Sequence, residues 1–221
     1  MPHNVHPYAH RIGIIRDWRS RWFAGKGKYP DFLKCDVLLR EFLDKKLRGF
    51  YVGGIDIERD QKALKINIKT GRPGMIIGKN GEGATKLKKE INTFLKKGKL
   101  IELEEVKIDI EEIRNPESNA RIVSEMIAES LEKRMPFRRI MKQMIEKVMA
   151  SREVEGVRIY IGGRLNGAEI SRSETLKKGR IPLQTFRADI DFWRERAHMT
   201  YGDLGIKVWI YKGEIFDKDS K

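Results

Sequence analysis

A short glycine loop between two helical segments constrains the fold of this chain more than any other feature. Gly78-Lys79-Asn80-Gly81 separates the apolar Met75-Ile76-Ile77 from a predicted helix over roughly Ala84–Leu95. Glycines at both ends let the backbone turn without Cβ clashes and approach another backbone closely. The loop opens onto a helix N-terminus, where free N–H groups favour an anion, and Lys79 adds a full positive charge. The loop is therefore suited to clamping a sugar-phosphate backbone.

The segments around this loop follow the order helix, strand, strand, short helix, glycine loop, helix, strand. Apolar residues recur at helical spacing over Tyr29–Arg48 and alternate around Val52–Ile57 and Leu64–Lys69, and a last strand is expected around Ile101–Ile113. This order matches the type II KH module, in which a G-x-x-G loop clamps the nucleic-acid backbone. The alternative is an ordinary glycine turn, because a four-residue match is weak by itself.

Two nucleotide-binding motifs are excluded. A P-loop needs a glycine five residues before the glycine that precedes its lysine, and then Ser or Thr after that lysine. Here Pro73 stands at the first glycine position and Asn80 follows Lys79. No G-x-G-x-x-G occurs after a predicted strand, so nucleotide hydrolysis is not expected.

Beyond Asn115-Pro116 the pattern predicts a second α+β domain, with two helices packed on an antiparallel sheet. Apolar helix faces run through Ile122–Leu131 and Phe137–Val148. We therefore expect an α+β chain whose KH domain has a three-stranded sheet with helices on one face. The expected bounds are 1–38 for a basic arm and the start of the first helix, 39–112 for the KH domain, 117–213 for the second domain and 214–221 for a short polar tail. Strands of the second domain are expected around Val157–Ile161, Ala168–Thr175, Phe186–Phe192 and Ile206–Ile210.

The charge of the chain predicts a polyanionic partner. Forty-six Lys and Arg against 32 Asp and Glu give a net charge of +14, and most of the surplus lies in the first half. Each cation placed on a phosphate releases condensed counterions. In the first 28 residues basic side chains alternate with aromatic ones, as on RNA surfaces. The alternative, that these aromatics dock on the chain's own domain, stays open.

A second cationic surface is expected on the helix after Pro136. Arg138, Arg139 and Lys142 lie away from its apolar face, and Arg138 and Lys142 are neighbours at the i, i+4 spacing. A phosphate chain across them would offset their mutual repulsion. The alternative is a solvated face neutralised by Glu132 and Glu146.

Nothing in the sequence predicts catalysis, a cofactor or a metal site. The histidines are scattered, Cys35 is the single cysteine, and no run has the length of a membrane span or a signal peptide, so an intracellular protein is expected. Asp189 and Asp191 form a D-x-D pair, but strand alternation places Arg187 on the same face, where it is expected to neutralise them.

Ordered motifs along nearly the whole chain resemble one family, the third protein of the small ribosomal subunit in its bacterial or organellar form. The most specific are Val5-His6-Pro7 with Arg11-Ile12-Gly13, Gly71-Arg72-Pro73-Gly74 leading into the glycine loop, Phe137-Arg138-Arg139, Gly163-Arg164-Leu165-Asn166-Gly167-Ala168-Glu169, Gly179-Arg180-Ile181-Pro182-Leu183, Arg187-Ala188-Asp189-Ile190-Asp191 and Gly205-Ile206-Lys207-Val208-Trp209-Ile210. The departures are Ala9 and Asn166, where glycine is usual, and Glu153-Val154, where a small Gly-Ala step is usual.

The resemblance implies a non-enzymatic ribosomal protein, on the ribosome in the cytoplasm or an organellar matrix, without cofactor or membrane. It implies partners in ribosomal RNA, messenger RNA and small-subunit proteins ten and fourteen, and a place for Arg138, Arg139 and Lys142 in the channel by which messenger RNA enters, where they would help unwind structured message. A free KH-type RNA regulator and a nucleic-acid enzyme acting through Asp189 or Asp191 are the alternatives. The expected ribosomal RNA contacts are Arg11, Trp18, Arg19, Trp22, Arg72, Arg164, Arg172 and Arg180.

Overall fold

The computed structural model describes residues 5–60, 63–97 and 105–216, which form two compact units. One unit comprises Trp18–Arg114, and the other combines the N-terminal residues through Asp17 with the chain from Asn115 onward. The residues expected to form one arm are thus divided between the two units. The expected strand start at 101–104 and the tail from 217 onward lie outside the described residues.

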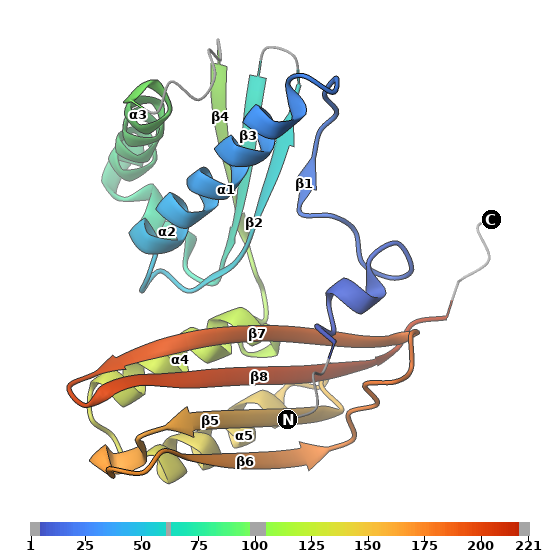
Figure 1. The fold of residues 1–221 in the computed structure, drawn as a ribbon, viewed down its shortest axis with the longest axis vertical. Helices are drawn as coiled ribbons and strands as arrows, with labels where there is room; N and C mark the ends of the chain where they lie inside the picture. The colour runs from blue at the N-terminus through green and yellow to red at the C-terminus, as the bar shows by residue number, and fades with distance from the viewer. Residues whose placement is uncertain (1–4, 61–62, 98–104, 217–221) are drawn as a thin grey trace. The chain divides into compact units, whose positions relative to one another are not determined.

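The Trp18–Arg114 unit is a sheet with three helices on one face (Figure 1). Strands β2 and β3 pair antiparallel, and β3 pairs parallel with β4. The predicted three-stranded KH sheet with helices on one face is confirmed, and a two-residue strand β1 extends it in parallel with β2. In sheet order, the strands are β1 (Ser20–Arg21), β2 (Val52–Arg59), β3 (Ala63–Thr70) and β4 (Glu105–Glu112), and the helices are α1 (Tyr29–Lys46), α2 (Pro73–Ile77) and α3 (Glu82–Lys97).

Strand alternation explains why the helices cover only one face of this sheet. Leu64, Ile66 and Ile68 of β3 are fully buried, and they pack in one core with apolar side chains of α1 and α3. The residues between them face the other way. There Lys65 and Lys69 form ion pairs with Asp109 and Asp56, at 3.2 and 2.9 Å, so this face has no apolar surface for a helix to cover.

Helices α2 and α3 cross at a distance that only glycine permits. A Cβ built on Gly83, in the first turn of α3, would lie 2.4 Å from the carbonyl oxygen of Ile76 and 2.9 Å from that of Ile77. Both obstacles are backbone atoms, which cannot rotate away. Gly83 therefore holds the two helices close together on either side of the glycine loop.

The second unit is an antiparallel sheet in the order β6-β5-β8-β7, with two helices behind it in Figure 1. The predicted α+β arrangement is confirmed here too. The expected strand around Ala168–Thr175 is shifted to Arg172–Gly179, because the chain leaves the η4 turn at residue 167 and does not pair with β5 until Arg172. The helices are α4 (Ala120–Glu132) and α5 (Phe137–Ala150), the strands are β5 (Gly156–Gly163), β6 (Arg172–Gly179), β7 (Ala188–Met199) and β8 (Gly202–Glu214), and the 3-10 turns are η1 (Ala9–Arg11), η3 (Pro116–Ser118) and η4 (Leu165–Gly167).

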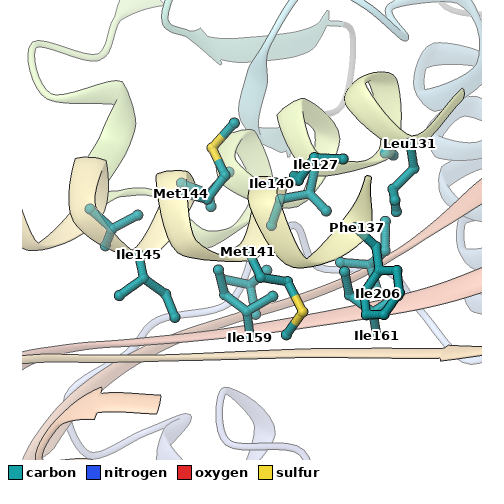
Figure 2. Close-up of a cluster of buried hydrophobic side chains, with 14 of the residues drawn as sticks. Ile127, Leu131, Phe137, Ile140, Met141, Met144, Ile145, Ile159, Ile161 and Ile206 are labelled. Carbon is teal, nitrogen blue, oxygen red and sulfur yellow. The ribbon is translucent and has the colours of Figure 1, made fainter. Parts of the chain in front are cut away.

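The main core of this unit lies between α4, α5 and the sheet. Figure 2 shows Met141 and Ile145 of α5 directed toward the sheet, where Ile159 lies, and Ile140 of α5 beside Ile127 of α4. The helical spacing of these apolar residues fixes which side of α5 is buried. As a consequence, Arg138, Arg139 and Lys142 remain on the exposed side.

The N-terminal segment packs on the opposite face of the same sheet, where a smaller apolar cluster lies around Phe192. The His6 ring meets the edge of Phe192, with centroids 4.7 Å apart. Arg11 is 1% exposed, and its guanidinium donates hydrogen bonds to the carbonyls of Pro7, Leu183, Thr185 and Ala188 at 2.7–3.1 Å. Burial lowers the pKa of Arg11 from its ordinary value, and nearby Asp189 opposes this shift.

We predict that Arg11→Met lowers the free energy of unfolding of the second unit by about 2–4 kcal/mol, because it leaves four buried or partly buried carbonyls without their charged donor. Arg139→Met, an exposed position in the same unit, is the control and should change it by less than about 0.5 kcal/mol. Urea denaturation followed by circular dichroism measures the loss. Hydrogen exchange should localise it to residues 183–192, and equal stability of the two variants would contradict the anchoring role.

A second substitution tests the crossing of α2 and α3. Gly83→Ala should destabilise the Trp18–Arg114 unit by about 1–3 kcal/mol, because its methyl group would overlap backbone oxygens. Gly74→Ala in α2 is a matched control, since a Cβ there meets nothing within 4 Å, and it should be neutral or slightly stabilising. Thermal unfolding of the full chain distinguishes the two, and a tolerated Gly83→Ala would show that the helices are free to separate.

Candidate nucleic-acid interface

The glycine loop forms a tight turn in which three of its four residues have a positive φ. Gly78 ends α2 with φ +70°, Asn80 has φ +51° and ψ +23°, and Gly81 has φ +79°. Asparagine tolerates this left-handed conformation better than most residues. The turn, η2 (Lys79–Gly81), leads directly into α3. Lys79 is thereby exposed beside the N-terminus of α3, as the sequence predicts for an anion-binding loop.

Apolar side chains flank this loop without being buried. Met75 is 49% exposed and Ile77 is 38% exposed, whereas Ile76 between them is 4% exposed and belongs to the core. The guanidinium carbon of Arg72, just before α2, lies 4.5 Å from the centroid of the Tyr51 ring. The loop therefore offers a cationic tip beside exposed apolar surface, which suits a phosphate and a base respectively.

The predicted cationic surface on α5 contains an ion pair that the sequence did not indicate. Arg138 donates to both carboxylate oxygens of Glu174 on β6, with its Nη2 2.7 Å from Oε1. This hydrogen bond holds the pKa of Glu174 below its ordinary value and raises that of Arg138. Neutralisation by Glu132 and Glu146 was the sequence-based alternative, but the carboxylate comes from residue 174. Arg139 and Lys142 are exposed beside this pair.

The other expected RNA contacts differ in how available they are. Arg11 is enclosed by carbonyls and anchors the N-terminal segment, so we no longer propose it as an RNA contact. Trp22 donates its indole N–H to Asp36 at 2.7 Å and packs against Phe32, which places it within its own unit. Trp18 is 59% exposed. Arg19 is half-buried, and its carbonyl accepts a hydrogen bond from Arg40.

Three candidate arginines belong to the second unit. Arg164 is half-buried, and its Nε donates to the carbonyl of Ala168 at 2.8 Å. Arg172, at the start of β6, and Arg180, just after its end, are exposed. Asn166 within η4 has φ +56° and ψ +26°, a conformation that explains how asparagine can stand where glycine is usual.

The D-x-D pair on β7 has structural roles, and the expected partner is corrected. Asp189 binds Arg16 at 2.5 Å, while Arg187 binds Glu214 instead. Asp191 accepts a hydrogen bond at 2.8 Å from the backbone N–H of Ala120, which begins α4. Among the described residues, no group of three or more His, Cys, Asp or Glu could hold a metal ion. Within the same residues, no helix is long and apolar enough to cross a membrane.

Sequence reasoning missed two residues that shape the candidate surfaces. Glu174 escaped notice because it lies 36 positions from Arg138, and no local spacing connects them. Gly83 stands at the edge of the glycine motif, but its role depends on a carbonyl seven residues earlier. The only sequence signal for Gly83 was a glycine at the start of a helix, where glycine is otherwise unfavourable.

Two family models match the chain. The one described as KH domain covers residues 38–118, and the one described as Ribosomal protein S3, C-terminal domain covers residues 127–210. Both matches fall on the α+β units described above. The first range contains the glycine loop, and the second contains α5.

Full-length relatives carry the name small ribosomal subunit protein uS3. The protein of Alkalilimnicola ehrlichii is 44% identical over 221 residues, covering 100% of this chain and 94% of the relative. That of Xanthomonas oryzae pv. oryzae is 46% identical over 217 residues, covering 98% and 86%, and that of Endomicrobium trichonymphae is 47% identical over 221 residues, covering 100% and 92%. The chain therefore belongs to the family of small ribosomal subunit protein uS3, structural and non-enzymatic ribosomal proteins with a KH domain.

Proposed function

We propose that the chain is a structural constituent of the small ribosomal subunit, in the cytoplasm or an organellar matrix. In this proposal it binds ribosomal RNA in the head of the subunit and lines the channel by which messenger RNA enters. The observation that carries the RNA-binding role is the η2 turn, which exposes Lys79 at the N-terminus of α3 beside the exposed Met75 and Ile77. The names of the uS3 relatives support the ribosomal setting.

The loop binds RNA through its backbone and one charge. Left-handed residues at Asn80 and Gly81 turn the chain sharply into α3, so the loop lies at the N-terminal end of this helix, where backbone N–H donors and the helix dipole favour an anion. A phosphate there would meet these donors and the Lys79 ammonium. Neither contact depends on base identity, so the loop positions the RNA and reads little of its sequence.

The α5 surface acts on messenger RNA in this proposal. Arg139 and Lys142 present exposed charges, while Arg138 already holds Glu174. A phosphate would have to compete with that carboxylate for Arg138, whose planar guanidinium can donate hydrogen bonds to either anion. Exposed ion pairs are worth little, about 0–1 kcal/mol, so the exchange is energetically accessible. Arg138 would thus release Glu174 to bind a phosphate, and rebind Glu174 as the messenger RNA moves past.

Further contacts complete the proposed placement. Trp18, Arg19, Trp22, Arg72, Arg164, Arg172 and Arg180 remain the proposed ribosomal RNA contacts, with Trp22 acting mainly to support its exposed neighbours. Small-subunit proteins ten and fourteen are the proposed protein neighbours. Four of these side chains, Trp18, Arg72, Arg172 and Arg180, are exposed at positions far apart in the sequence, which suits a large folded RNA better than a short linear ligand.

The loop is tested by placing carboxylates on it without straining the turn. Gly78→Asp would confuse charge with strain, because Gly78 has φ +70°. Lys79→Asp with Asn80→Asp keeps residues that fit their conformations, and should weaken binding to a single-stranded 12-nucleotide RNA at least about tenfold. It should also move the chain from the small-subunit fraction toward the free fraction of a sucrose gradient.

The control for this variant makes the same change of net charge at the other end of α3. Lys96→Asp with Lys97→Gln replaces two exposed lysines there, and its RNA affinity should fall far less. Fluorescence anisotropy measures the affinity. Equal losses in both variants would show that only overall charge matters, and a wild-type chain absent from the small-subunit fraction would exclude the ribosomal role.

The α5 surface is tested by Arg138→Ala, Arg139→Ala and Lys142→Ala together. These exposed side chains should be dispensable for folding, and ribosomes carrying the variant should be slowed more on messages with stable hairpins than on unstructured ones. The salt dependence of single-stranded RNA binding should also weaken, by about 0.7 in slope for each lost phosphate contact.

Lys147→Ala, Lys177→Ala and Lys178→Ala remove the same charge from other exposed positions of this unit and serve as the control. Reconstituted translation of paired templates, with and without a hairpin, provides the measurement. An equal slowing on both templates would reject the proposed role in unwinding.

A further inference from the structure

A cavity of about 410 Å³ opens in the second unit, where three turns meet. These are the link between α4 and α5, the η4 turn and the β7–β8 hairpin. Its floor is apolar and is formed by Phe137, Leu165 and Leu204, which are at most 6% exposed. Their burial means that the floor is part of the folded core and is already shaped.

One wall of the cavity is an aromatic ring held from two sides. A Cβ built on Gly167, whose φ is +78°, would lie 3.3 Å from the Tyr201 ring, so glycine there lets the ring pack on the η4 backbone. The Arg164 guanidinium carbon lies 5.6 Å from the ring centroid, and its Nε is fixed by the Ala168 carbonyl. Tyr201 is nevertheless 60% exposed, which leaves ring surface open to a ligand.

The charged groups around the cavity all carry the same sign. Arg134 and Arg164 line it, and none of the described residues that line it is acidic. Arg134 occupies a left-handed conformation, φ +59°, in the link between the helices. A second hollow of about 300 Å³ shares Phe137 and Asn166 with the first and is bordered by Arg138, Arg172 and Glu174. A cationic path thus runs from the cavity to the α5 surface.

We propose that this cavity binds one unpaired nucleobase of a single-stranded RNA. The base would stack on Tyr201 above the apolar floor, with its flanking phosphates at Arg134 and Arg164, and the strand would continue toward Arg138. A flat ring attached to an anion on each side satisfies both the apolar floor and the arginine rim. An apolar peptide segment would satisfy the floor and leave the guanidinium groups without an anion. The choice of RNA as occupant rests on the proposed function.

Photo-crosslinking of the full chain gives the first test. The probe is a uridine dodecamer with one 4-thiouridine, bound to a chain carrying Lys79→Asp and Asn80→Asp so that contacts at the KH loop are weakened. After irradiation, mass spectrometry should identify crosslinks in peptides containing Phe137 or Tyr201. Crosslinks confined to other peptides would overturn the pocket, and this result does not depend on how any pocket variant folds.

Tyr201→Leu in the same background gives the second test. It removes the stacking surface but keeps an apolar side chain, and should weaken binding of the dodecamer about fivefold to a hundredfold. Tyr201→Phe keeps the ring and should restore most of the affinity. If Tyr201→Leu binds like its parent while the triple alanine variant of α5 binds weakly, the pocket is excluded and the proposed function stands. If neither variant binds more weakly, the pocket and the proposed RNA contact of the α5 surface are both excluded.

Discussion

The buried guanidinium of Arg11 joins the two ends of the chain into one folded unit. It has no direct carboxylate partner among the described residues, so four carbonyl dipoles compensate its charge. Such an arrangement is stable only if all the guanidinium donors are hydrogen-bonded at once. A buried charge that lacks one partner loses more free energy on leaving water than its remaining hydrogen bonds return. As a result, the segment through Asp17 has one defined position on the sheet. In the sequence, the whole Trp18–Arg114 unit is thereby inserted between the two segments that form the second unit.

Local sequence patterns predicted the helices and strands. They could not predict the roles of individual side chains, because those roles depend on polar contacts between residues far apart in the sequence. Strand alternation and helical spacing located the helices and most strands, because those periodicities follow from backbone geometry alone. Arg11 illustrates the limit: an arginine among aromatics in a basic segment reads as an RNA contact, and only the carbonyls near residue 185 give it another role. The pairing of Arg138 with Glu174 was unpredictable for the same reason. The turn at the glycine loop was predictable because it depends on four consecutive residues.

The distribution of ion pairs decides which cations are left for RNA. On the open face of the KH sheet, Lys65 and Lys69 are matched by carboxylates on neighbouring strands. These exposed pairs add little stability, but they remove positive potential from that face. Exposed cations away from this face include Lys79 and the lysines of α3. The surplus of positive charge in the sequence thus indicated a polyanionic partner. The ion pairs show which face of the sheet has its positive charges neutralised.

The same backbone turn occurs once in each unit, and its surroundings give it different uses. In η2 and η4 an asparagine with φ near +50° precedes a glycine with φ near +80°. After η2 the chain enters α3, so the turn exposes a helix N-terminus that favours phosphate. After η4 no helix follows, and Gly167 instead seats the Tyr201 ring beside an apolar floor. An identical local conformation thus lies beside a helix N-terminus in one unit and beside an aromatic ring in the other, because different elements follow the two turns.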